Sequence, residues 1–146
     1  MTHRAESIIE AVKTNVTGLT TTGTRVFRGR VYALADTELP ALCVYLGPDK
    51  IIGQYSHAKY DCELTINIEA VVKSSTVQVD TTLNLIREQV AIALQADYTQ
   101  GLAYVLNTIE GDADAPELSG EGEKQSAALK MEWKFHYRRS RTNPGA

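Results

Sequence analysis

Residues 126–138 read SAALKMEWKFHYR and carry the clearest structural signal in the chain. Apolar side chains occupy every second position, and most side chains between them are polar or charged. This alternation predicts a β-strand with one face in the core and the other in a polar environment. The apolar set is Ala127, Leu129, Met131, Trp133, Phe135 and Tyr137. Because strands seldom exceed about ten residues, we expect part of this one to project beyond the sheet, either bent or paired in an arm with the segment before residue 111.

Further strands are expected on both sides of this one in sequence. Residues 61–70 alternate in the same way and predict a strand with one polar face. Residues 41–46, by contrast, are apolar at every position, which is typical of a strand covered on both faces. The Gly-Pro-Asp sequence at 47–49 is expected to close that strand as a turn. Weaker patterns predict strands at 25–34 and 104–109 and a polar loop at 111–125.

Two segments, at 5–16 and 79–97, show the three- and four-residue spacing of apolar side chains that predicts amphipathic helices. Gly18 follows the first helix as a natural stop. Ser75 and Gln78 precede the second as a capping box, in which the two side chains bond backbone N–H groups at the helix start.

The predicted order of elements is α-β-β-β-α-β-β, and the loops between neighbouring strands are too short for helical crossovers. Such strands pair mainly antiparallel, and the two helices must cover the apolar face that they leave. We therefore expect a single α+β domain over residues 1–146, with a sheet of four or five strands and both helices on one face. Residues 139–146 are expected to form a flexible basic tail.

The composition is that of a soluble globular protein, with 43% hydrophobic and 23% charged residues. A net charge of −3 argues against a general polyanion binder. The chain has no run of the ~20 apolar residues that a membrane span needs, and its first residues lack the apolar stretch of a secretory signal. We expect a cytoplasmic protein in which Cys43 and Cys62 are buried, reduced thiols.

The residues offer no motif for catalysis, metal binding or cofactor binding. The three histidines, at positions 3, 57 and 136, stand at no metal-ligand spacing and beside no recognisable nucleophile. The glycines form neither a P-loop nor a dinucleotide-binding pattern. Three carboxylates on one face of the strand at 61–70 would suit acid–base chemistry, although alternation places acids on a wet face in any case. These carboxylates are Asp61, Glu63 and Glu69.

Charge is distributed unevenly along the chain. Residues 110–123 hold six acids and no base, and without them the remaining chain is net positive. Arginines gather at 25–30 and again at 138–141. An acidic segment and a basic end suit head-to-tail contact between identical subunits, although polar loops and solvated tails give the same pattern. Binding of nucleic acid through these arginines has less support, because no aromatic residues alternate with them in a known module.

The apolar strand at 41–46 raises a second question about assembly. Two helices cover one face of a small sheet, so the other face of this strand needs a different cover. That cover is either a neighbouring subunit or loops of the same chain. The candidate assembly interface comprises Leu42, Cys43, Val44, Tyr45, Asp112, Asp114, Glu117, Arg138, Arg139 and Arg141.

The chain resembles the tail terminator proteins of long-tailed bacteriophages, the group typified by the minor tail protein U of phage lambda. The resemblance rests on the N-terminal helix, on the strand that contains Arg25-Val26-Phe27 and Arg30-Val31-Tyr32, and on the ELPALCVY passage at 38–45. It also rests on the long alternating strands and the helix between them. The acidic stretch at 111–125 matches no feature of that family.

The resemblance implies a structural virion protein with no enzymatic step and no cofactor. Six copies would form a ring on the finished tail tube, stop its polymerisation and offer a surface for head joining. The implied partners are further copies of the chain, the tail tube protein and a head-completion or neck protein. DNA would only pass through the lumen, and no membrane would be involved. The implied location is the head-proximal end of the virion tail, reached from the host cytoplasm during assembly. The alternatives are another phage neck or tail-completion protein, or a small α+β enzyme or ligand-binding domain whose cleft is lined by the acidic strand face.

Overall fold

The long alternating strand lies inside a twisted sheet. In the computed structural model, which describes residues 2–29, 36–73, 79–119 and 126–146, strand β6 spans Ser126–Ser140. It pairs antiparallel with β3 (Lys59–Lys73) from one end to the other. The expectation that part of β6 projects beyond the sheet is therefore wrong, because β3 is equally long. The segment before residue 111 does pair with β6, but as the sheet strand β4 (Val105–Ala113).

The sheet confirms the predicted α+β fold and the predicted order of elements. Its strands lie in the order β1-β2-β3-β6-β4. Strand β2 (Ala41–Ser56) is antiparallel to β3, and only β1 (Val26–Arg28) is parallel to its neighbour β2. The short β5 (Glu117–Ser119) also pairs with β6. Residues 111–119 are thus partly strand rather than loop, and residues 30–35 and 120–125 lie outside the described residues.

Strand β2 is much longer than expected, and the predicted turn at 47–49 is wrong. The strand passes through these residues with a register shift between Leu46 and Asp49 opposite β3. A bulge of this kind tolerates Pro48, which has no N–H to donate to the ladder. Gly47 lies so close to β3 that an added Cβ would stand 2.8 Å from the Thr65 carbonyl oxygen. The Gly-Pro pair therefore bends the strand instead of ending it.

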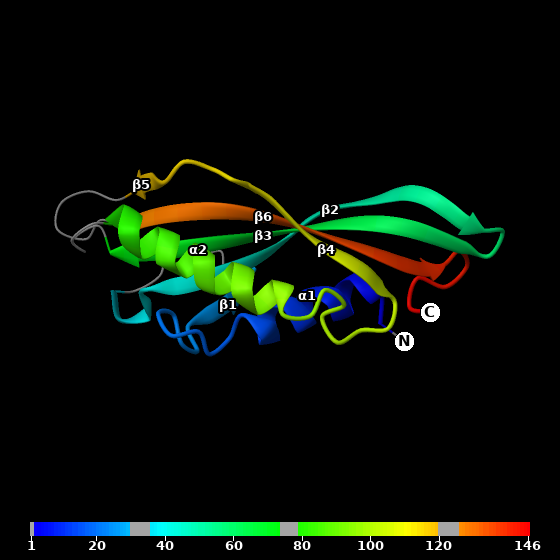
Figure 1. The fold of residues 1–146 in the computed structure, drawn as a ribbon, viewed down its shortest axis with the longest axis horizontal. Helices are drawn as coiled ribbons and strands as arrows, with labels where there is room; N and C mark the ends of the chain where they lie inside the picture. Colours follow the sequence, from blue (N-terminus) through cyan, green and yellow to red (C-terminus); the bar gives the residue numbers. More distant parts are fainter. Residues whose placement is uncertain (1, 30–35, 74–78, 120–125) are drawn as a thin grey trace.

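Helices α1 (Arg4–Asn15) and α2 (Val79–Gln95) cover the same face of the sheet, as Figure 1 shows. At the start of α1, His3 accepts a hydrogen bond from the Ala5 N–H through its Nδ1 atom, at 3.0 Å. Beyond the end of α1, Gly18 adopts a φ of +89°, the left-handed conformation that favours glycine. The capping box expected at 75–78 lies outside the described residues.

The hydrophobic core lies between the helices and the sheet. Trp133, Phe135 and Tyr137 of β6 are its largest buried side chains, together with the alternating apolar residues of β3. Both cysteines are free thiols and buried, as the sequence predicts. Among the described residues, none of the helices has the length and apolar character that crossing a membrane demands.

The two chain termini meet at one end of the molecule, beside the hairpin that joins β2 to β3 (Figure 1). The Arg4 N–H donates to the Pro144 carbonyl oxygen at 3.0 Å, and the Arg141 N–H donates to the Ala58 carbonyl oxygen at 2.8 Å. The sequence predicts a flexible tail over residues 139–146. Arg139 and Ser140 instead belong to β6, and residues 141–146 fold back against α1 and the hairpin. A short 3₁₀ turn, η1 (Asp36–Glu38), precedes β2.

Candidate assembly surfaces

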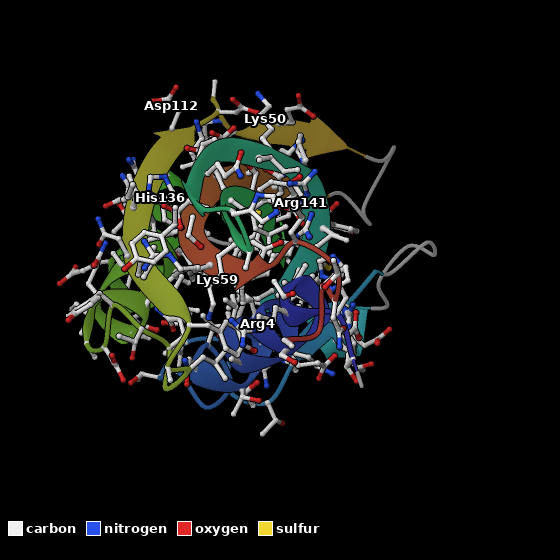
Figure 2. The ribbon with its side chains drawn as sticks, turned by 90° about the vertical axis from the view of Figure 1, so that its right-hand side faces the viewer. Arg4, Lys50, Lys59, Asp112, His136 and Arg141 are labelled. Carbon is white, nitrogen blue, oxygen red and sulfur yellow. The ribbon has the colours of Figure 1, made fainter. Side chains whose placement is uncertain are left out.

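The face of the sheet that points away from the helices is polar and hollowed. Figure 2 shows the sheet curling so that Lys50 of β2 and Asp112 of β4 approach the same side. A groove of about 320 Å³ lies between these strands, floored by Glu63 and Thr65 of β3 and by three residues of β6. The polar face predicted from alternation is therefore confirmed. This face is less exposed to solvent than expected, because Thr65 is only 8% exposed.

A chain of polar and charged contacts runs along this face of the sheet. Glu63 lies 3.0 Å from His136 Nε2 through Oε2 and 3.8 Å from Lys134 Nζ through Oε1. Lys134 also lies 3.6 Å from Glu132. The hydrogen bond from His136, followed by the charge of Lys134, holds the pKa of Glu63 below its usual value.

The three carboxylates that share the β3 face do not act together. Asp61 accepts a hydrogen bond from Arg138 Nε at 2.7 Å, and Glu63 has the partners described above. Burial raises the pKa of Glu69 above its usual value, and the positive charge of Lys130 offsets only part of this rise. Each acid therefore has its own surroundings, and within the described ranges no group of three or more His, Cys, Asp or Glu side chains is placed to hold a metal ion.

Most of the apolar residues proposed from the sequence as an interface are covered within the single chain. Leu42, Cys43 and Val44 are each at most 2% exposed. Leu42 and Val44 belong to the main core, whereas Cys43 lies on the other face of β2. Tyr45 is half-buried, and burial raises its pKa to about 12. The burial of this part of β2 therefore requires no neighbouring subunit.

The exposed apolar surface lies further along the same strand. Leu46, Ile51, Ile52 and Tyr55 of β2 are 51–61% exposed. Within the described part of the chain, β1 covers the outer edge of β2 only as far as Val44. Beyond Val44, no strand among the described residues pairs with that edge, which also carries these apolar side chains. No local pattern indicates this edge, because Gly-Pro-Asp at 47–49 predicts that the strand ends at residue 46.

The described part of the acidic segment, residues 110–119, covers the end of β4, the residues that follow it and β5. Glu110, Asp112, Asp114 and Glu117 are all exposed, and among the described residues none of them has an ion-pair partner. Asp112 and Asp114 also form part of the groove rim, opposite Lys50.

The basic residues gather at the end of the molecule that carries the termini. Arg138 pairs with Asp61, and its guanidinium lies 3.5 Å from the centroid of the Tyr55 ring. Arg139 and Arg141 lie over the Tyr60 ring, at 5.4 and 6.0 Å. Arg4 and Lys59, which no sequence pattern singles out, lie at the same end, because the Arg4 N–H bonds the Pro144 carbonyl oxygen and the Arg141 N–H bonds that of Ala58, next to Lys59. Arg4, Lys59 and Arg141 are labelled in Figure 2. The pairing of β3 with β6 brings Lys59 near the arginines of β6, and the packing of α1 at this end adds Arg4.

Comparisons with solved structures find chains of similar fold. No protein-family model matches the chain, and no curated protein matches it. One solved structure with a similar fold is a chain of the "Virion of native gene transfer agent (GTA) particle". The two chains share 14% sequence identity and superpose with a TM-score of 0.55, over 93% of this chain and 88% of the other. At this identity the likeness shows a common fold.

Proposed function

We propose that this chain is a structural protein of a virion and, more specifically, a phage tail terminator. The observation that carries the proposal is the fold shared with a virion chain over 93% of the sequence. The resemblance of the element order to tail terminators points in the same direction. We propose no enzymatic step.

In this proposal, six copies form a ring that closes the head-proximal end of the tail tube and receives the head-completion protein. DNA passes through the lumen of the ring. The outer edge of β2 suits such assembly, because an exposed apolar strand edge tends to pair with another chain. The exposed side chains at that edge include Ile51 and Ile52. The apolar contact between subunits is thus expected at the later half of β2 rather than at residues 42–44.

Deletion of the gene from its phage tests the function directly. We expect tails of abnormal length that do not join heads, and we expect the purified protein to restore normal joining. Tails of normal length that join heads in its absence would contradict the proposal. A matched strain that carries the Arg87→Glu variant, altered at an exposed position on α2, controls for changes in expression.

Another neck or tail-completion protein is the second candidate, since the virion likeness does not distinguish positions along the neck. Electron microscopy of virions labelled on this chain separates the two. Label at the junction of tube and neck supports the terminator, whereas label within the neck supports the second candidate.

A further inference from the structure

A second hollow, of about 270 Å³, lies at the end of the molecule where the termini meet. It is lined by Arg4, Lys59, Ala103, Tyr104, Leu106 and Arg138. Three of these residues are cations, and none is an acid. The lining comes from the first turn of α1, from the start of β3, from the end of β6 and from the chain around the start of β4. Four segments that are distant in sequence therefore build one positively charged pocket.

Arg4 is held in place at this pocket. Its guanidinium lies 4.2 Å from the centroid of the Tyr104 ring, and its Nη1 donates to the Arg138 carbonyl oxygen at 2.5 Å. Its Nε is buried and has no hydrogen-bond partner among the described residues. The chain itself thus leaves part of the hydrogen-bonding capacity of this guanidinium unused, although the group is already oriented.

The positive charge of the pocket is only partly neutralised. Asp61 accepts hydrogen bonds from Arg138 at 2.7 and 3.3 Å and so balances one of the three cations. Arg4 and Lys59 have no ion-pair partner within the described part of the chain. A fixed planar guanidinium beside a mobile ammonium suits an oxyanion, and above all a carboxylate.

We propose that this pocket binds a carboxylate from the acidic segment of a second copy of the chain. The inference rests on the proposed ring and names the contact that would join neighbours in it. The acidic segment supplies exposed carboxylates at Asp112 and Asp114 that lack ion pairs among the described residues. Their charge complements that of the pocket, and such complementarity fixes partner and register.

Asp112 is too far from the pocket of its own chain to make this contact. Along β4, the stretch from Leu106 to Asp112 spans roughly 20 Å at about 3.3 Å per residue. Figure 1 shows β4 running from the end with the termini toward β5 at the far end, and Figure 2 places Asp112 on a different side from Arg4. The contact therefore joins two chains. In the proposed ring it is head-to-tail, and contacts of this type build rings when the rotation closes.

Substitution of Lys59 tests the pocket, with sedimentation velocity of the full chain as the measurement. Lys59 is exposed at the start of β3, so Lys59→Glu leaves the core untouched, as thermal unfolding will verify. We expect the dissociation constant for self-association to rise at least about tenfold. Arg87→Glu, the same kind of charge reversal on α2, is expected to leave it unchanged.

A reciprocal substitution identifies the occupant. We expect a chain with Lys59→Glu, Asp112→Lys and Asp114→Lys to recover self-association, because the two surfaces again have opposite charge. Loss without recovery overturns the assignment of the acidic segment. Normal self-association of Lys59→Glu overturns the pocket while the proposed ring stands. If Lys59→Glu weakens only the binding of duplex DNA, the pocket serves nucleic acid and the inference fails. If the unaltered chain forms no ring, either alone or on tail tubes, the proposed function itself fails.

Discussion

At the scale of single residues, Gly47 shows how closely β2 and β3 approach. A Cβ at this position would lie 2.8 Å from the Thr65 carbonyl oxygen and 3.2 Å from the Thr65 side chain. Strand β3 is paired with a neighbouring strand on each side, so the Thr65 backbone has little freedom to move away from an added Cβ. Glycine is therefore required here by the available space rather than by its φ angle.

We expect Gly47→Ala to lower the free energy of unfolding by about 1–3 kcal/mol, the usual cost of forcing an extra methyl group into a packed region. Urea unfolding followed by circular dichroism measures the change. Gly53→Ala is the matched control, because no heavy atom lies within 4 Å of its added Cβ. Equal losses in the two variants would contradict this account of the bulge.

Tyr137 gives a prediction about pH. Its hydroxyl donates to Asp49 Oδ2 at 2.6 Å. Burial, reinforced by this hydrogen bond, raises its pKa well above the usual tyrosine value. The unfolded chain therefore releases this proton near pH 10 while the folded chain retains it. Stability from this group is complete below about pH 10 and is lost as the pH rises further.

We expect the urea midpoint to fall between about pH 9 and 11, and to fall less steeply in Tyr137→Phe. The phenylalanine variant has no proton to release, so the difference in slope isolates this one group. Identical slopes in the two proteins would show that the buried hydroxyl does not contribute. At neutral pH, the variant also loses one hydrogen bond, about 1 kcal/mol.

At the scale of elements, Gln100 ties two helices to the sheet. Its Nε2 donates to the Leu94 carbonyl oxygen at 2.7 Å and to Thr108 Oγ1 at 3.0 Å. Its Oε1 accepts a hydrogen bond from Asn15 Nδ2 at 2.7 Å. The ends of α1 and α2 and the middle of β4 thus meet at one side chain, which is 5% exposed.

We expect Gln100→Ala to lower the free energy of unfolding by about 2–3 kcal/mol, because it removes the hydrogen bonds that one nearly buried side chain makes to three elements. Gln54→Ala is the control, since Gln54 is exposed on β2; we expect it to change stability by less than about 0.5 kcal/mol. Chemical denaturation of both variants provides the comparison. If Gln100→Ala loses no more stability than the control, Gln100 does not stabilise the docking of the helices against β4.

At the scale of the whole molecule, the apolar outer edge of β2 is the main candidate for burial on assembly. Ile51 and Ile52 are 56% and 51% exposed, on a strand edge that no described strand covers. Ile92 on α2 is 65% exposed and offers the same side chain at a different surface.

We expect Ile51→Glu to abolish ring formation and Ile92→Glu to leave it intact, with little change in monomer stability for either. Light scattering and negative-stain images of the purified proteins measure this. If both variants still form rings, the edge of β2 is not an interface. If both lose them, the effect is one of general charge rather than of a particular surface.

The sequence by itself determined the two alternating strands, the two helices and the burial of both cysteines. The period-two pattern of residues 61–70 and 126–138 specifies a strand and its core face at once, because a change of register by one residue would expose every apolar side chain. The helical spacing at 5–16 and 79–97 acts in the same way.

The tertiary structure alone decided where β2 ends, which cations share a pocket, and how the helices attach to β4. Gly47 and Pro48 favour a turn locally, but the long β3 beside them supplies ladder partners that carry the strand past them as a bulge. Arg4, Lys59 and Arg138 come from distant parts of the chain. The pairing of β3 with β6 brings Lys59 near Arg138, and the packing of α1 adds Arg4. Local sequence specifies the conformation of a segment. Which segments lie beside it in the folded protein depends on contacts between parts that are distant in sequence, and no local pattern contains that information.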